Sequence, residues 1–215
     1  LKPTSSSDPY ALRRQALGII RILVEHKIHT DLTSLLKTCQ KAFPENLQKE
    51  EVVVEVLNFI INRAKGIFVD MGFLKGEIEA CLSVRSDDFY DVFQRLSALH
   101  QFRKEHTTFQ QLLEVHKRCQ GQINGLKKLS FSAAHMIENE EKNLFHTLQE
   151  MEPLFKQTLE EKNYKKTLSL LSEMQPKLAN LFDHVKILAD DESLKTNRLA
   201  LLQEVSDLFI QIADF

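Results

Sequence analysis

The residues best suited to chemistry are four cations in a stretch that contains no acidic residue. From residue 115 to residue 137 the chain has no Asp or Glu, and it carries Lys117, Arg118, Lys127 and Lys128. Ammonium and guanidinium groups can neutralise phosphates, so this spacing is typical of a nucleic-acid-binding surface. Cations near the C-terminal end of a helix also offset the helix macrodipole. A solvated helix end therefore explains the same residues equally well.

The same stretch has side chains that could contact bases. The amides of Gln120, Gln122 and Asn124 can reach base edges, and Phe131 offers a ring for stacking. The whole chain has 28 basic and 30 acidic residues, a net charge of −2, so it has no overall positive field. Any binding of nucleic acid would have to use this local patch.

No motif in the sequence indicates catalysis. The phosphate-binding pattern GxxxxGK[ST] and the dinucleotide pattern GxGxxG are both missing. His116 and Cys119 are three residues apart on an apolar helix face, which favours core packing over a nucleophile and its base. The sequence Glu25-His26-x-x-His29 lacks the HExxH order and a third ligand, which favours surface histidines over a zinc site. The acidic turn at 190–192 favours a solvated helix cap over a metal site.

Composition limits the compartment and the context of the chain. The three cysteines form no CxxC pair, which indicates a reducing compartment, and we expect a cytoplasmic protein. No run of about 18 apolar residues could span a bilayer, so we expect no membrane partner. The chain begins with Leu1 and not Met, which suggests a fragment of a longer protein.

Helices must position these residues. The chain has only 6 Gly and 5 Pro, and compact β proteins need many such turn residues. We therefore predict an all-α fold of antiparallel helix bundles in two helical subdomains, with the apolar periodicity broken near 104–107. Residues 1–104 would form a helical linker or body subdomain, and residues 105–215 a second helical domain.

Apolar spacing and capping residues predict where the helices lie. We expect Asp8 to cap the first helix with Pro9 at its first position, Thr30 or Asp31 to cap the second, and Ser86 or Asp87 to begin a helix. Gly72 is expected to be a left-handed cap. Other helices are predicted over 50–70, 75–82, from Thr107 or Thr108 to Asn124, and over 138–161, 164–188 and 192–213, with a loop at 124–135.

Two sequence blocks add a family resemblance. Residues 8–25, DPYALRRQALGIIRILVE, resemble a segment of the β subunit of bacterial-type glycyl-tRNA synthetase, which runs close to DPFALRRAALGVLRIL. Residues 181–202, LFDHVKILADDESLKTNRLALL, resemble that family's C-terminal signature, close to FFDxVMVMxxDxxLRxNRLxLL. The second block alone also resembles the anticodon domain of arginyl-tRNA synthetase. Lys117-Arg118 falls where the glycyl family usually carries a Lys-Arg pair.

The resemblance implies the C-terminal part of a class II glycyl-tRNA synthetase, with a helical anticodon-binding domain at 105–215. It implies binding of the anticodon stem-loop of tRNA(Gly), in support of ATP-dependent attachment of glycine. ATP and glycine would be bound in the α subunit or α region, so this segment would hold no cofactor and no catalytic residue. The expected partners are tRNA(Gly) and the rest of the synthetase, with no membrane and no DNA.

On this basis we predict a set of tRNA-binding residues. Lys186 stands where the family has Met, and Arg198 could contact a base or could form an ion pair with Asp183 or Asp190 that joins the last two helices. We favour the ion pair for Arg198. The predicted set is Lys117, Arg118, Asn124, Lys127, Lys128, Lys186, Asn197 and Arg198.

An alternative is a helical scaffold that mediates subunit or domain assembly without touching RNA. Such a scaffold would expose an apolar stripe larger than a few hundred Å². Residues 8–104 are the part of the sequence where we would expect it.

Overall fold

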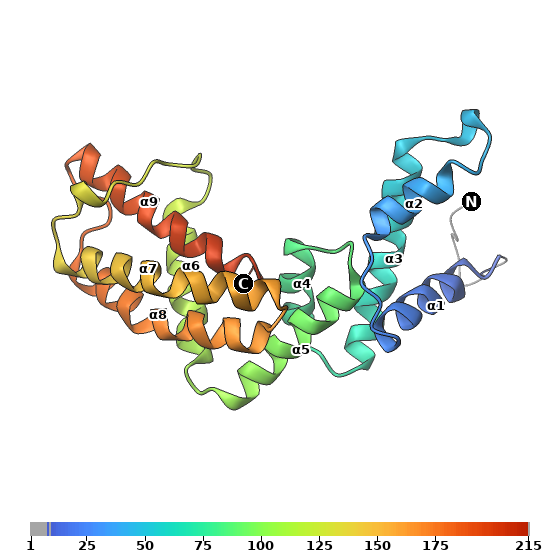
Figure 1. Ribbon diagram of the computed structural model, residues 1–215, viewed down its shortest axis with the longest axis horizontal. Coiled ribbons are helices and arrows are strands. Elements are labelled where there is room, and N and C mark those ends of the chain that lie inside the picture. Colours follow the sequence, from blue (N-terminus) through green and yellow to red (C-terminus); the bar gives the residue numbers. More distant parts are fainter. Residues whose placement is uncertain (1–7, 9, 215) are drawn as a thin grey trace. The chain divides into compact units, whose positions relative to one another are not determined.

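The computed structural model describes residue 8 and residues 10–214 (Figure 1). Every regular element in these described residues is a helix, which confirms the predicted all-α fold. The chain divides into two compact units, which we call unit 1 (residues 1–96) and unit 2 (residues 97–215). This division falls inside helix α5, Phe89–Glu105, whereas the sequence placed the boundary at the end of that helix. The domain bounds 1–104 and 105–215 stay a prediction.

In unit 1, helices pack around the long helix α3, Glu50–Asp70. Helices α1, Leu12–Glu25, and α2, Leu32–Gln40, both contact α3, and α4, Lys75–Val84, follows it (Figure 1). Apolar residues at helical spacing form the shared core, because they return to the same face every three or four positions. The buried members are Ala16, Ile20, Leu23 and Val24 of α1 and Val53, Ile60, Ala64, Ile67 and Phe68 of α3.

The predicted helix ends in unit 1 have mixed outcomes. Helix α1 begins at Leu12 and not beside Asp8, since Ala11 precedes it in a left-handed conformation with φ of 52°. Asp8 still accepts a hydrogen bond from the backbone N–H of Arg13 at 3.1 Å, and Pro9 lies outside the described residues. Asp31 does cap α2, and its hydrogen bond from the backbone N–H of Ser34 lowers the pKa of Asp31.

The predicted left-handed cap after α3 is confirmed, because Gly72 has φ of 95°. The predicted start of α5 at Ser86 or Asp87 is wrong by at least one residue. Asp88 supplies the cap, accepting the backbone N–H of Asp91 at 3.0 Å, and the helix begins at Phe89.

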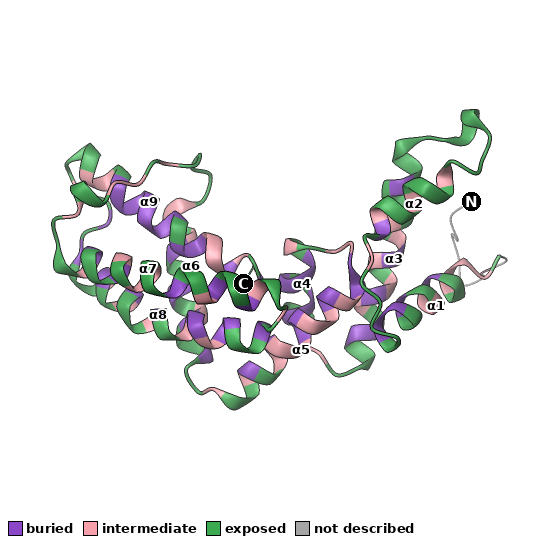
Figure 2. Ribbon diagram, in the orientation of Figure 1, coloured by how far each residue is buried: buried purple, intermediate pink, exposed green. Residues whose placement is uncertain are grey.

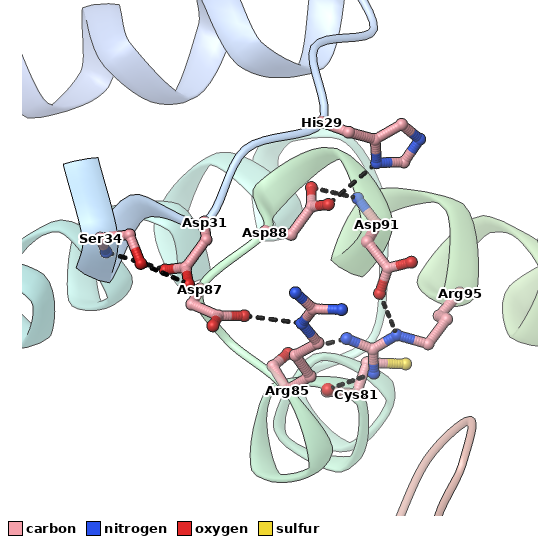
Figure 3. Close-up of polar contacts among 9 residues, drawn as sticks. All are labelled: His29, Asp31, Ser34, Cys81, Arg85, Asp87, Asp88, Asp91 and Arg95. Carbon is pink, nitrogen blue, oxygen red and sulfur yellow. Dashed lines mark hydrogen bonds and ion pairs between the residues drawn. The ribbon is translucent and has the colours of Figure 1, made fainter.

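A buried polar network ties the start of α5 to the end of α4 and to the α1–α2 loop (Figure 3). Arg95, with only 1% of its side chain exposed, donates to Asp91 at 2.9 Å and to the carbonyl oxygens of Cys81 and Arg85 at 2.6 and 2.7 Å. His29 Nδ1 lies 2.9 Å from Asp88 Oδ2. His29 is thus engaged by a carboxylate, and no three His, Cys, Asp or Glu side chains of the described part could hold a metal ion.

Unit 2 is built around helix α9, Glu192–Phe209. Helices α7, Asn139–Glu160, and α8, Tyr164–His184, form an antiparallel hairpin, and α6, Phe109–Ile123, packs on α8 and α9 (Figure 1). The middle of α9, from Asn197 to Gln203, is buried (purple in Figure 2), as expected for a helix segment packed between neighbours. Two one-turn 3-10 helices, Glu45–Leu47 in unit 1 and Ala133–His135 in unit 2, complete the described elements.

Two predicted helix ends in unit 2 extend too far. Helix α8 stops at His184 and not at 188, because Val185 is extended with φ of −117° and ψ of 124°. This extension presents the carbonyl oxygen of Lys186 to a buried guanidinium of α9. Helix α9 stops at Phe209 and not at 213.

Candidate nucleic-acid interface

The loop that carries the predicted basic residues is fixed along α9. Gln203 accepts the backbone N–H of Leu129 at 2.8 Å and donates to the carbonyl oxygen of Lys127 at 3.0 Å. Asn197 accepts the backbone N–H of Ser132 at 2.8 Å. Both amides are buried, so each must satisfy its hydrogen-bonding groups inside the protein. The loop at 124–132 is therefore positioned by α9.

Arg198 is a buried clamp with partners that differ from the predicted ones. Its side chain is 6% exposed, and its Nε donates to Glu141 at 2.8 Å while Nη1 donates to the carbonyl oxygen of Lys186 at 2.9 Å. The prediction of Asp183 or Asp190 as its ion-pair partner is wrong. Glu141 is buried at the start of α7, where it also caps the helix, and that helix end packs beside α9. Arg198 thus joins α9 to α7 and to the α8–α9 connection.

Two of the predicted lysines, Lys128 and Lys186, are paired with carboxylates. Lys128 forms ion pairs with Glu204, at 2.9 Å, and with Asp207. The hydrogen bonds to Asp207 and then Glu204 raise the pKa of Lys128. Lys186 lies 2.9 Å from Asp190, and this hydrogen bond lowers the pKa of Asp190. Lys186 and Asp190 therefore present a nearly neutral pair to an approaching phosphate, whereas Lys128 with its two carboxylates presents a group of net negative charge.

Arg118 lies between a ring and a carboxylate. Its guanidinium carbon is 4.4 Å from the ring centre of Phe182, and its Nη1 is 3.6 Å from Asp183 Oδ1. Both partners are at the C-terminal end of α8. The ring contact has the geometry of a cation–π interaction.

Lys117, Asn124 and Lys127 are the exposed, unpaired members of the predicted set. Lys117 is on α6 next to Arg118, Asn124 follows the end of α6, and Lys127 is in the loop on α9. Within the described residues no carboxylate forms an ion pair with either lysine. Their charges are the ones most available to a phosphate backbone.

The predicted set therefore falls into three groups. Arg118 contacts Asp183 at the C-terminal end of α8, and Lys186 follows Asp183 by three residues. Arg118 and Lys186 therefore both lie near this helix end. Asn124, Lys127 and Lys128 lie in and next to the loop on α9, while Asn197 and Arg198 are buried behind it. Lys117 is the α6 neighbour of the first group. Whether any member contacts RNA stays a prediction.

Sequence reasoning missed several residues that shape this surface. Gln203 fixes the loop, Glu141 holds Arg198, and Phe182 supports Arg118. A polar residue inside an otherwise apolar stretch of α9 was the signal that could have identified Gln203. Phe131, expected as a stacking ring, packs against Phe145 with ring centres 4.9 Å apart, so part of its surface is covered.

The pair His116 and Cys119 belongs to the core of unit 2, as predicted. The ring of His116 is fully buried and stacks on Phe209 with centres 4.5 Å apart. Burial lowers the pKa of His116 to about 4 and raises the pKa of Cys119 to about 12. A neutral imidazole and a protonated thiol are the forms suited to packing.

Comparison with known proteins places these features in a family context. Residues 1–83 match the family described as glycyl-tRNA synthetase beta subunit, and residues 105–213 match the DALR anticodon binding domain. The chain is 34% identical over 219 residues to a glycine–tRNA ligase beta subunit of Desulforamulus reducens, covering all of this chain. The corresponding protein of Clostridioides difficile is 32% identical over 100% of this chain. That of Aliivibrio fischeri is 34% identical over 97% of this chain.

These matches confirm the resemblance read from the two sequence blocks. The chain spans 31%, 31% and 30% of the length of these three relatives. None of the described helices is both long and apolar enough to cross a membrane.

Proposed function

From the premise that this chain belongs to the family of DALR anticodon binding domains, we propose that it is the tRNA-binding part of a glycine–tRNA ligase. Unit 2 binds the anticodon stem-loop of tRNA(Gly) in the cytoplasm, while ATP and glycine are bound elsewhere in the enzyme. The observation that carries this proposal is the DALR match over 105–213, which includes the exposed cations of α6 and its following loop.

Binding, not bond chemistry, is the contribution of unit 2. Lys117 and Lys127 form no ion pair with a carboxylate among the described residues. No ion pair has to break before they bind a phosphate, so they contribute most to binding. Lys128 and Lys186 must exchange their carboxylate partners and contribute less. The binding energy at the anticodon holds the distant acceptor end in register with the active site.

In this proposal Asn197 acts through the loop, and Arg198 acts through α7 and the α8–α9 connection. Their buried contacts to Ser132, Glu141 and the Lys186 carbonyl fix the backbone on both sides of the basic surface. A fixed loop loses less conformational freedom on binding, which strengthens binding without a direct RNA contact.

The test is a titration of a glycine anticodon stem-loop RNA with the complete chain at several salt concentrations. A patch of about four cations predicts a log–log slope of roughly −3, at about −0.7 per neutralised phosphate. Replacing both Lys117 and Lys127 with Ala should reduce the slope by about 1.4. The matched control replaces Lys165 and Lys166 at the opposite end of α8, and it should leave the slope unchanged.

Salt-independent binding, or an equal loss in both double variants, would contradict the assignment of this surface. Far-UV circular dichroism of all variants separates a loss of contact from a loss of fold.

A specific observation favours a second role, domain assembly, for unit 1. Of the 16 large hydrophobic residues that are exposed in the described part, 13 lie in unit 1. Several line a groove between α1 and α3, among them Ile19, Val52 and Val56. A groove with exposed apolar side chains on both of its walls is typical of an interface. Its occupant in this proposal is the remaining polypeptide of the longer beta subunit, since the relatives are about three times as long as the chain.

This second role is tested by replacing Ile19 and Val56 with Ser. The complete beta subunit should lose on the order of 1–3 kcal/mol of stability, because the groove is covered there. The isolated chain should lose clearly less stability than the complete beta subunit, because part of each side chain, 37%, is exposed there. Equal effects in the two proteins would contradict a covered groove.

A further inference from the structure

The ring–cation–carboxylate cluster of Arg118, Phe182 and Asp183 has the parts of a base-binding site. The guanidinium lies over the Phe182 ring at 4.4 Å, so one of its two flat faces is covered. The Arg118 side chain is nevertheless 49% exposed, so about half of its surface is open to solvent. An unpaired base commonly stacks on the plane of an arginine guanidinium.

Asp183 provides a hydrogen-bond acceptor next to that plane. Its side chain is 63% exposed, and its distance of 3.6 Å to Arg118 is longer than a normal hydrogen bond. No other donor of the described residues forms a hydrogen bond with this carboxylate. Its acceptor positions are therefore open to a ligand.

The chemistry of a carboxylate acceptor selects among the bases. Cytosine carries an amino group that donates a hydrogen bond, and a carboxylate accepts from that group. Uracil has a carbonyl oxygen at the same position, which cannot donate and which repels a carboxylate. Glycine anticodons share two cytosines, so a site that prefers cytosine over uracil suits them.

We propose that one shared cytosine of the glycine anticodon stacks on the exposed side of the Arg118 guanidinium. The amino group of this cytosine donates a hydrogen bond to the Asp183 carboxylate. Phe182 contacts the guanidinium and holds it in place. Lys117, adjacent to Arg118 on α6, contacts the phosphate backbone in this proposal. This proposal rests on the proposed function, and it adds a base-reading residue, Asp183, to the predicted set.

The neighbours of Arg118 also fix its orientation before RNA binds. A guanidinium between a ring and a carboxylate keeps its orientation before RNA arrives, so less side-chain freedom is lost on binding. A lysine at this position could supply the positive charge but not the flat guanidinium group on which a base can stack. The arginine is therefore the part of the cluster that a charge-conserving substitution tests.

The experiment compares three RNA stem-loops, one with the glycine anticodon and two with one of its shared cytosines replaced by uridine. Binding to the complete chain is measured by fluorescence anisotropy. At the cytosine read by Asp183, the natural chain should prefer cytosine over uridine by about tenfold. Asp183→Asn should reduce that ratio toward one, since an amide can also donate to the uracil oxygen. Glu173→Gln, an exposed carboxylate elsewhere on α8, is the matched control and should keep the ratio.

Arg118→Lys gives an independent readout. It should weaken binding of all three RNAs by roughly tenfold with an unchanged salt slope, since the charge remains and the stacking plane is lost. An unchanged affinity for Arg118→Lys, or a cytosine preference that survives Asp183→Asn, would overturn this inference while RNA binding itself stands. No binding of any of the RNAs would overturn the proposed function as well.

Discussion

Unit 1 and unit 2 are both helical, but they differ in how many large apolar side chains they leave exposed. Unit 1 leaves 13 large hydrophobic residues exposed among those described, and unit 2 leaves three. Unit 2 buries more than half of the residues of α9, whereas α2 of unit 1 buries only Leu32. A unit that closes its own core can offer a polar surface to RNA. A unit with an open core face is suited to contact with other polypeptide.

The two units also differ in the reach of their buried ion pairs. Arg95 of unit 1 pairs with Asp91, four residues earlier on the same helix. Arg198 of unit 2 pairs with Glu141, which is 57 residues away on another helix. Arg95 also donates to the carbonyl oxygens of Cys81 and Arg85, so it joins α5 to the neighbouring α4, whereas Arg198 joins helices that are far apart in the sequence. Unit 2 therefore depends on a buried contact between distant parts of the chain.

The largest predicted effect tests that dependence. Arg198→Ala leaves Glu141 buried without its cation, and we expect it to cost about 3–5 kcal/mol in the free energy of unfolding. Chemical denaturation followed by circular dichroism measures this cost. Lys186→Ala removes an exposed ion pair and should leave the free energy of unfolding nearly unchanged. Similar costs for the two variants would show that the long-range pair is not the clamp described above.

The second prediction uses the buried histidine of unit 2. His116 has a folded pKa of about 4 and an unfolded value near 6.5, so the unfolded state binds a proton more readily between these values. Its contribution to stability is therefore fully present above about pH 6.5 and is lost as the pH falls toward about pH 4. From about pH 7.5 to about pH 5 we expect a loss of about 2 kcal/mol from this group.

His116→Phe keeps an aromatic ring against Phe209 and removes the titrating group. Denaturation at both pH values should show a smaller loss in this variant, by about 2 kcal/mol. An identical pH dependence in the two proteins would rule out His116 as the source.

The third prediction compares adjacent cations of the loop. Lys127 has no carboxylate partner among the described residues, whereas Lys128 has Glu204 and Asp207. Lys127→Ala should therefore reduce the salt slope of RNA binding by about 0.7, and Lys128→Ala by clearly less. The measurement is anisotropy over a salt series. An equal or larger change for Lys128→Ala would mean that its carboxylates move away when RNA binds.

The smallest predicted effect concerns the open face of unit 1. Ile22 is 54% exposed on α1, so Ile22→Ser should change the unfolding free energy of the isolated chain by no more than about 0.5 kcal/mol. Chemical denaturation of the isolated chain measures this change. A cost above about 2 kcal/mol would show that this face is already covered within unit 1.

Local features of the fold could be predicted from sequence, and distant pairings could not. Apolar periodicity predicted α3 over 50–70, and the spacing of His116 and Cys119 predicted their burial. The partner of Arg198 and the neutralisation of Lys128 could not be predicted, since they join residues 57 and 79 positions apart. Helical spacing is a property of neighbouring residues, whereas an ion pair between helices depends on how those helices pack.

The candidate surface was predicted as a set of residue types rather than as an arrangement. Sequence identified Lys117, Arg118 and Lys127 as cations without an acidic neighbour in their stretch. It gave no sign that Phe182 would lie under Arg118, because α6 and α8 meet only in the folded unit.

The most direct test of RNA binding by unit 2 is a salt series of anisotropy titrations with a glycine anticodon stem-loop. The complete chain and its Lys117→Ala, Lys127→Ala double variant are measured side by side. We predict a slope of roughly −3 for the natural chain and roughly −1.6 for the variant, at about −0.7 per phosphate. Identical slopes, or no binding to this RNA at low salt, would contradict the account.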